Sequence, residues 1–149
     1  MTHLCDTNLW IALAVERHAH HGAARLWLEG VPAGDEVVFN RATQTAFLRL
    51  LTQAVAEDYE PVSQRRAWAC YDAFLGDDRI GWMAEPEGLE SSWRGLADLD
   101  SPSPKRWMDA YLAAFALGAR LRLVTFDRAF RQFESAGLDL LLLSPLDPA

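Results

Sequence analysis

Cysteine, long apolar runs and basic residues are all scarce in this chain of 149 residues. The two cysteines, Cys5 and Cys70, form no CxxC pair, which leaves a zinc site unsupported and favours reduced core thiols over a disulfide. No apolar stretch reaches the roughly 18 residues that are needed to cross a bilayer. Asp6 also interrupts the apolar start that a secretion signal would need. We therefore expect a cytoplasmic protein without membrane contact.

The shortage of basic residues limits what the protein can bind. Asp and Glu number 21 against 14 Lys and Arg, and the formal net charge is −7. This balance excludes attraction of nucleic acid over the whole surface, so any such binding must be local or metal-assisted. In contrast, apolar residues make up 50% of the chain and six residues are Trp, which is far from the composition of disordered proteins. We expect residues 1–149 to form a single domain.

Apolar strand-like runs alternate with helical patterns along the chain, which predicts a parallel sheet covered by helices on both faces. The predicted strands cover 3–6, 36–39, 80–83, 121–125 and 140–143. The predicted helices cover 8–16, 20–29, 41–56, 62–75, a segment that begins at Pro86, 104–117 and 127–135. Ser103 is the expected N-cap of helix 104–117, and Gly118 is its expected C′ residue. The predicted fold class is α/β, with three layers and four to five parallel strands.

Three aspartates stand near the ends of predicted buried elements. Asp6 closes the first strand, and Asp127 follows the strand 121–125. Asp109 lies in the second turn of the helix that leads to that strand. Parallel strands bring their carboxyl ends to one edge of the sheet, where α/β folds bind ligands. Carboxylates gathered there repel one another unless a divalent cation joins them. Together the three acids predict a site for Mg²⁺ or Mn²⁺, because both ions prefer hard oxygen ligands.

Each aspartate also has a purely structural explanation. Asp6 could cap helix 8–16, and Asp127 could cap the helix after it. Asp109 could pair with Lys105, which lies one helical turn away. For any single residue these explanations are about as good as a ligand role. If all three aspartates had only structural roles, their common position at one edge of the sheet would be a coincidence. A shared site is therefore favoured.

Four short segments follow one another in a fixed order, and three of them carry one of these acids. They are Asp6–Trp10, Thr43–Arg49, Asp109–Ala113 and Thr125–Arg128. Together they resemble the motifs of PIN-domain ribonucleases, with the VapC-type toxins of bacterial toxin–antitoxin pairs as the most similar branch, and the resemblance spans nearly the whole chain. It implies a single-strand-specific endoribonuclease that uses Mg²⁺ or Mn²⁺ and leaves a 5′-phosphate and a 3′-hydroxyl. It also implies an RNA substrate, a small antitoxin partner and a homodimer.

The resemblance assigns roles to individual residues. Asp6 and Asp109 would be the principal metal ligands, and Asp127 would bind the metal directly or through water. These three acids would be the catalytic set, because the metal would lower the pKa of a bound water that attacks the phosphodiester. Three polar residues would orient the carboxylates through hydrogen bonds without binding the metal themselves: Asn8, Thr43 and Thr125.

One position departs from the family pattern. The family usually carries a Glu three residues after the Thr of its second motif, and this chain has Ala46 there. The missing carboxylate weakens a second metal site or moves its ligand elsewhere. The sequence is therefore compatible with either one or two bound metal ions. Glu85, just past the third predicted strand, is a candidate extra acid, although it fits equally the first turn of the helix that follows.

Arg49 and Arg128 are the candidate phosphate contacts, because both lie within motif segments of an otherwise acidic protein. Each would serve equally well as an ordinary surface base.

Two other classes of function compete with the nuclease. A haloacid-dehalogenase-like phosphatase is disfavoured, because Asn8 stands where its Asp-x-Asp motif needs the second Asp. The stronger rival is a PIN-fold module with a weakened site that binds protein or RNA without cutting. Ala46 favours that module, whereas the intact set of Asp6, Asp109 and Asp127 opposes it.

Overall fold

Five strands form one sheet in the order β3-β2-β1-β4-β5. The computed structural model describes residues 1–54 and 57–146. The strands are β1 (Thr2–Cys5), β2 (Glu36–Phe39), β3 (Ile80–Trp82), β4 (Arg122–Thr125) and β5 (Asp139–Leu142). Every pair of neighbouring strands is parallel. The predicted α/β class is therefore confirmed, with the upper of the two expected strand counts.

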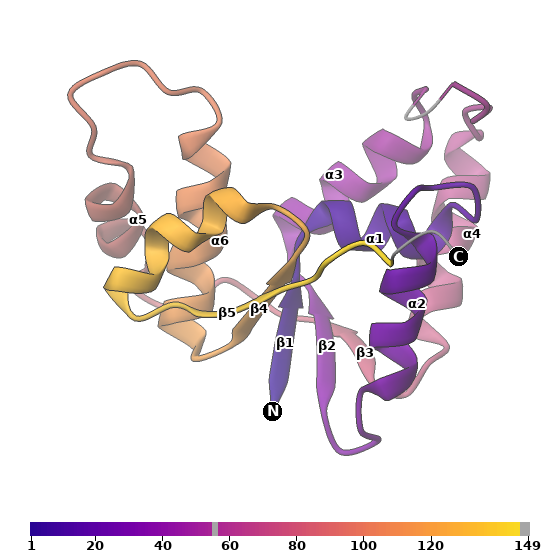
Figure 1. Ribbon diagram of the computed structural model, residues 1–149, viewed down its shortest axis with the longest axis horizontal. Helices are drawn as coiled ribbons and strands as arrows, with labels where there is room; N and C mark the ends of the chain where they lie inside the picture. Colours follow the sequence, from indigo (N-terminus) through magenta and orange to yellow (C-terminus); the bar gives the residue numbers. More distant parts are fainter. Residues whose placement is uncertain (55–56, 147–149) are drawn as a thin grey trace.

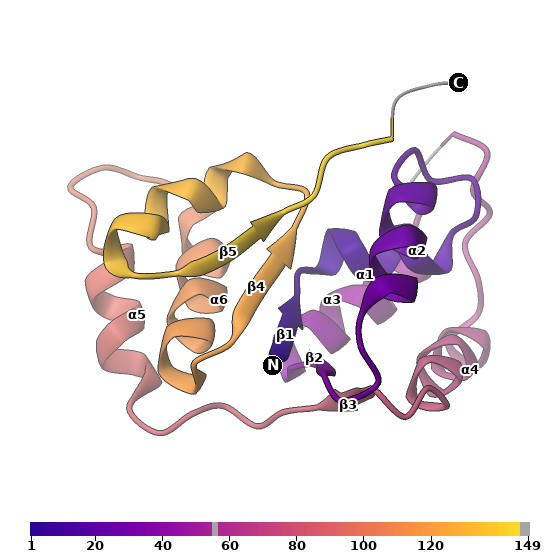
Figure 2. The same cartoon turned by 60° about the horizontal axis from the view of Figure 1, so that its bottom comes forward.

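Helices cover both faces of this sheet (Figure 1, Figure 2). One face carries α1 (Thr7–Ala14), α2 (His21–Gly30), α3 (Arg41–Leu51) and α4 (Gln64–Leu75). The opposite face carries α5 (Leu89–Ala97), α6 (Arg106–Ala119) and the 3₁₀ helix η1 (Arg128–Ala136). The three-layer architecture is thus confirmed. Within residues 1–54 and 57–146, no helix is both long enough and apolar enough to span a bilayer.

The three inner strands β2, β1 and β4 are buried on both faces, because successive side chains alternate between two hydrophobic cores. Cys5 and Val124 belong to the core beneath α1–α4, whereas their neighbours Leu4 and Leu123 belong to the core beneath α5, α6 and η1. All four side chains have no exposed surface. This double burial fixes the central strands firmly, and with them the carboxyl edge of the sheet.

The strand order reverses between β1 and β4, the position at which open α/β sheets bind ligands. From β1 the chain passes to β2 and β3 on one side, and it later returns to β4 on the other side of β1. In open α/β sheets this reversal leaves a crevice at the carboxyl ends of the two strands. Asp6 directly follows β1, and Asp127 lies two residues after β4. The first turn of α6, with Asp109, lies toward the same edge, because α6 leads back to the amino end of β4 (Figure 1).

Both predicted ends of α6 are wrong. The helix begins at Arg106 rather than Pro104, because the backbone carbonyl of Ser103 takes the Arg106 N–H at 3.0 Å in a preceding turn. At its other end α6 runs past Gly118 to Ala119, and Arg120 takes the left-handed conformation with φ 58°. Gly118 instead allows Pro86 to pack closely against α6, since a Cβ at this position would lie 3.2 Å from Cγ of Pro86.

Other boundaries differ by a few residues. The helix predicted for 41–56 ends at Leu51, and residues 55 and 56 lie outside the described residues. The helix expected from Pro86 begins at Leu89, after Gly88 with φ 77°. Segment 128–136 is a 3₁₀ helix, which begins with a side-chain cap from Asp127. None of these shifts moves an aspartate away from the carboxyl edge.

Candidate active site

Asp6 is fixed where β1 passes into α1. Its backbone N–H donates to the carbonyl of Val124 at 2.9 Å, which continues the β1–β4 ladder. Its carboxylate Oδ1 accepts the N–H of Thr7 at 2.7 Å and so caps α1. The capping explanation therefore holds for Asp6, but it uses only one carboxylate oxygen.

Thr125 joins two of the aspartates. Its hydroxyl donates to Oδ2 of Asp6 at 2.7 Å and accepts the backbone N–H of Asp127 at 3.0 Å. Nδ2 of Asn8 also donates to this hydroxyl, at 3.3 Å. A threonine hydroxyl has one donor and two acceptor positions, so all of its capacity is used. The bonds orient Asp6 and the chain at Asp127 relative to each other.

Asp127 has a partner on each oxygen. Oδ1 accepts the N–H of Ala129 at 2.9 Å and caps η1. Oδ2 lies 2.5 Å from Nζ of Lys105. Burial alone would raise the pKa of Asp127, but the hydrogen bonds from Lys105 and Ala129 outweigh it and lower that pKa.

Lys105 is the residue of this site that sequence reasoning underrated. It is the only lysine in the chain, and its Nζ also lies 4.0 Å from Oδ2 of Asp109. Its side chain is 66% exposed, whereas that of Asp109 is 11% exposed. The spacing of Lys105 and Asp109 by one turn was visible in the sequence. The contact to Asp127 was not, because it depends on how η1 packs beside α6.

Asp6 and Asp109 carry charge that the protein neutralises only in part. Burial, with smaller effects from the charges of Asp109 and Asp127, raises the pKa of Asp6 to about 6. Burial also raises the pKa of Asp109, and the nearby charges of Lys105 and Arg106 only reduce the effect. The acid cluster, which we define as Asp6, Asp109 and Asp127, is therefore short of positive charge.

The donor set suits a hard divalent cation. The three carboxylates come from different elements, and Oδ1 of Asn8, beside Thr125, is buried without a hydrogen-bond partner. Oxygen ligands of this kind are those that Mg²⁺ and Mn²⁺ prefer. Within the described ranges no group of three Asp, Glu, His or Cys side chains stands ready to hold a metal. At the acid cluster, Nζ of Lys105 lies within ion-pair distance of both Asp109 and Asp127.

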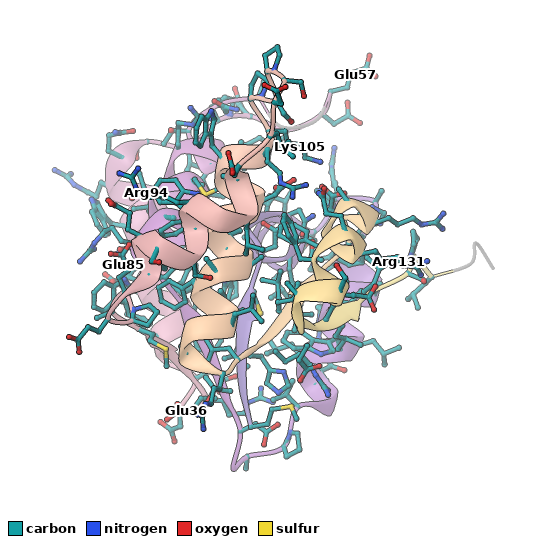
Figure 3. The ribbon with its side chains drawn as sticks, turned by 90° about the vertical axis from the view of Figure 1, so that its left-hand side faces the viewer. Glu36, Glu57, Glu85, Arg94, Lys105 and Arg131 are labelled. Atoms are coloured by element: carbon teal, nitrogen blue, oxygen red, sulfur yellow. The ribbon has the colours of Figure 1, made fainter. Side chains whose placement is uncertain are left out.

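Two predicted contributors lie elsewhere. The hydroxyl of Thr43 accepts the Asn40 N–H at 3.0 Å and donates to the Asn40 carbonyl, so it stabilises the start of α3 instead of orienting an aspartate. Glu85 accepts a 3.0 Å hydrogen bond from the hydroxyl of Tyr111. Figure 3 shows Glu85 well below Lys105, away from the upper end of α6. The carboxylate missing at Ala46 is therefore not replaced by Glu85.

The two candidate phosphate contacts lie on helices that cover opposite faces of the sheet. Arg128 is exposed and directly follows Asp127 at the start of η1. Arg49 is exposed on α3 and lines a hollow of about 420 Å³ together with Arg41 and Trp68. Arg106, in contrast, donates to the Leu96 carbonyl at 2.9 Å and holds α5 against α6.

Comparisons with known sequences all indicate the same protein family. The sequence pattern of the PIN domain family matches residues 4–135. Over 145 residues the chain is 52% identical to Ribonuclease VapC41 of Mycobacterium tuberculosis, covering 95% of this chain and 98% of that protein. It is 30% identical to Ribonuclease VapC39 of the same organism over 139 residues, covering 93% and 97%.

Solved structures share the fold. The VapBC2 structure from Rickettsia felis, bound to a DNA fragment from its promoter, contains a chain that superposes with a TM-score of 0.70 at 14% identity, covering 97% of this chain and 100% of that chain. VapC20 of Mycobacterium tuberculosis, a toxin that cleaves the sarcin-ricin loop, superposes with a TM-score of 0.64 at 23% identity, covering 91% and 95%. At these identities the likeness concerns the fold alone.

Proposed function

Because the chain belongs to the PIN domain family, in its branch of VapC ribonucleases, we propose that it is a metal-dependent endoribonuclease that cuts single-stranded RNA. One observation carries the metal dependence. Three aspartates from three separate elements lie near enough to influence one another, since burial and the charges of Asp109 and Asp127 raise the pKa of Asp6 to about 6. Such a cluster needs a cation to neutralise it at neutral pH.

The residues present suit Mg²⁺ or Mn²⁺. Asp6 and Asp109 are the proposed principal ligands, because their charge is least compensated by the protein. Asp127 contributes directly or through water, and Thr125 and Asn8 hold the carboxylates in place. When bound, the ion supplies a water of lowered pKa and positive charge beside the scissile phosphate.

Hydrolysis of RNA at this site leaves a 5′-phosphate and a 3′-hydroxyl. A bond forms between the water oxygen and phosphorus, and the bond from phosphorus to the 3′ oxygen breaks. The proton that water loses passes through solvent to the leaving 3′ oxygen. Arg128, exposed beside Asp127, is placed to bind a neighbouring phosphate, and Arg49 extends that contact along α3.

We further propose that this ribonuclease is the toxin of a cytoplasmic toxin–antitoxin pair and acts as a single PIN domain that forms a homodimer. Relatives of similar fold were solved as VapBC pairs from Rickettsia felis and from nontypeable Haemophilus influenzae. Large apolar side chains are exposed in both layers of helices and offer contacts for a small antitoxin: Leu26 and Trp68 in one layer, Trp107 and Met108 in the other. The pairing predicts a short open reading frame next to this gene, and a gene neighbourhood without one would contradict it.

Cleavage of a pool of short RNAs with Mn²⁺ tests the nuclease. The purified protein should cut, and Asp6→Asn or addition of a chelator should abolish cutting. Asp98→Asn is the matched control, because it removes one negative charge from an exposed residue outside the acid cluster and should leave the rate unchanged. Cutting that persists in Asp6→Asn would reject the metal site. No cutting by the unaltered protein would favour a binding module without catalysis.

A further inference from the structure

The acid cluster holds a positive charge of its own. Lys105 Nζ lies 2.5 Å from Oδ2 of Asp127 and 4.0 Å from Oδ2 of Asp109. It is the only lysine of the chain, and it lies immediately before α6, where the side chain can reach η1. Figure 3 shows it at the upper end of α6, opposite the end of the molecule where Glu36 begins β2. The ammonium therefore lies at the carboxyl edge of the sheet.

The contacts divide the acid cluster into two parts. Asp127 has a donor on each oxygen, from Lys105 and from the N–H of Ala129. Asp109 receives no hydrogen bond from any described residue, and Lys105 only approaches it. Positive charge is thus already present at Asp127 and is still missing between Asp6 and Asp109.

Two nearby candidates, helix α3 and Glu85, supply no further carboxylate for a second metal ion. Helix α3 contains no Asp or Glu from Arg41 to Leu51, and Ala46 is half-buried within it. Glu85 is bonded to Tyr111 and lies away from Lys105. A second divalent ion beside Asp127 would have to share its carboxylate with the ammonium of Lys105.

Building on the proposed ribonuclease function, we propose that Lys105 is the second cationic group of the active site, which works with one divalent ion held by Asp6 and Asp109. An ammonium has three N–H donors. One donates to Asp127, which leaves two for the oxygens of the scissile phosphate. Its side chain is 66% exposed, so a phosphate that enters from solvent can reach it. The fixed charge stabilises the negative charge that grows on those oxygens during hydrolysis.

Lys105→Met tests the proposal, because it removes the charge and keeps an unbranched side chain. Two measurements are made on each protein: Mn²⁺ binding by calorimetry and cleavage of a labelled single-stranded RNA. The unaltered protein should bind one Mn²⁺ per chain. Lys105→Met should bind Mn²⁺ about tenfold more tightly, since the repulsion from a neighbouring positive charge is gone, yet cut about 100-fold more slowly. Lys105→Arg retains the charge and should stay close to the unaltered protein in Mn²⁺ affinity.

Arg94→Met is the matched control. It removes one positive charge from α5, where Arg94 pairs with Glu90 at the surface, and it should change neither measurement. If Lys105→Met binds Mn²⁺ more tightly and cuts as fast as before, Lys105 only fills an empty metal position and the proposal is wrong. If both binding and cleavage fall, Lys105 is structural and the proposal is equally wrong. If the unaltered protein neither binds Mn²⁺ nor cuts RNA, the ribonuclease function itself fails.

The single lysine allows a direct measurement that does not depend on activity. In protein labelled with ¹³C-lysine, the side-chain signals belong to Lys105 alone. They should keep their position near that of the metal-free protein when Mg²⁺ saturates the site. Asp127→Asn gives the reference for a released side chain. Movement of the Lys105 signals to that reference on addition of Mg²⁺ would show that the ion displaces the ammonium and would overturn the proposal.

Discussion

The hydroxyl of Thr125 donates a 2.7 Å hydrogen bond to Oδ2 of Asp6, across 119 positions of sequence. This bond links the ends of two neighbouring strands, β1 and β4, at the point where the strand order reverses. Because Thr125 is fully buried, its hydroxyl has no water to replace the bond. The orientation of Asp6 therefore depends on one side chain of a different strand.

Thr125→Val keeps the shape of this side chain and removes its hydroxyl. We expect the free energy of unfolding to fall by about 1–3 kcal/mol, because the Asp127 N–H and the Asn8 amide lose their acceptor. Cleavage should fall by about 10–100-fold, the usual effect of losing a group that orients a metal ligand. Urea unfolding and RNA cleavage with Mn²⁺ measure the two effects.

Thr52→Val is the matched control for this change. Its hydroxyl bonds only backbone carbonyls at the end of α3, so cleavage should be unaffected. A Thr125→Val protein that cuts at the full rate would show that Asp6 keeps its orientation without the hydroxyl.

The raised pKa of Asp6 predicts how stability depends on pH in the metal-free protein. Burial lifts this pKa from 3.8 to about 6, so the folded state holds the proton more tightly than the unfolded state. The stability that this proton gives is complete below pH 3.8 and is lost as the pH rises through about 6. A shift of about two units corresponds to roughly 3 kcal/mol. Asp6→Asn should therefore be more stable than the unaltered protein at pH 8 by up to that amount, and about equally stable at pH 4.

Urea unfolding at the two pH values, with a chelator present, checks this dependence. Saturating Mn²⁺ should reverse the order at pH 8, because the ion stabilises only a folded protein that keeps the Asp6 carboxylate. Equal effects of Asp6→Asn at both pH values would show that the carboxylate is not destabilising when ionised.

The positions of Asp6 and Asp127 at one edge of the sheet could be predicted from sequence, because they follow from strand order. Asp6 and Asp127 each come at the end of an apolar run, and parallel strands bring such ends together. The ion pair between Lys105 and Asp127 could not be predicted, since it depends on the packing of two helices whose residues are 22 positions apart. Thr43 was assigned by its motif, but its hydroxyl bonds Asn40 within its own helix start.

The end of α6 shows a different limit of sequence reasoning. Glycine is typical of a helix end, but at Gly118 the missing Cβ makes room for Pro86. Sequence alone does not distinguish a glycine that ends a helix from one that allows a close contact. Arg120 takes the left-handed position, φ 58°, although glycine is favoured there. A β-carbon in this conformation costs roughly 1–2 kcal/mol.

Arg120→Gly should therefore stabilise the protein by about 0.5–1 kcal/mol, after allowance for the greater freedom of glycine in the unfolded chain. The backbone bond from the N–H of Leu121 to the Ala116 carbonyl, 2.8 Å, is retained in the variant. Urea unfolding measures the gain. Arg120→Ala is the control, because it removes the same charge but keeps the β-carbon, and it should give no gain. Equal gains in both variants would show that stability rises because the charge is removed and not because the backbone strain is relieved.

Arg49→Ala and Arg128→Ala separate the two candidate phosphate contacts. Binding of a labelled single-stranded RNA is measured by anisotropy between about 50 and 200 mM salt, with a chelator present to prevent cutting. Each lost contact should reduce the slope of log affinity against log salt by about 0.7. Arg128 directly follows Asp127, so its loss should also slow cleavage, whereas Arg49 lies on the α3–α4 hollow and should affect binding alone. Arg25→Ala is the control, because Arg25 pairs with Glu29 on exposed α2. A slope that stays unchanged in either variant would remove that arginine from the RNA path.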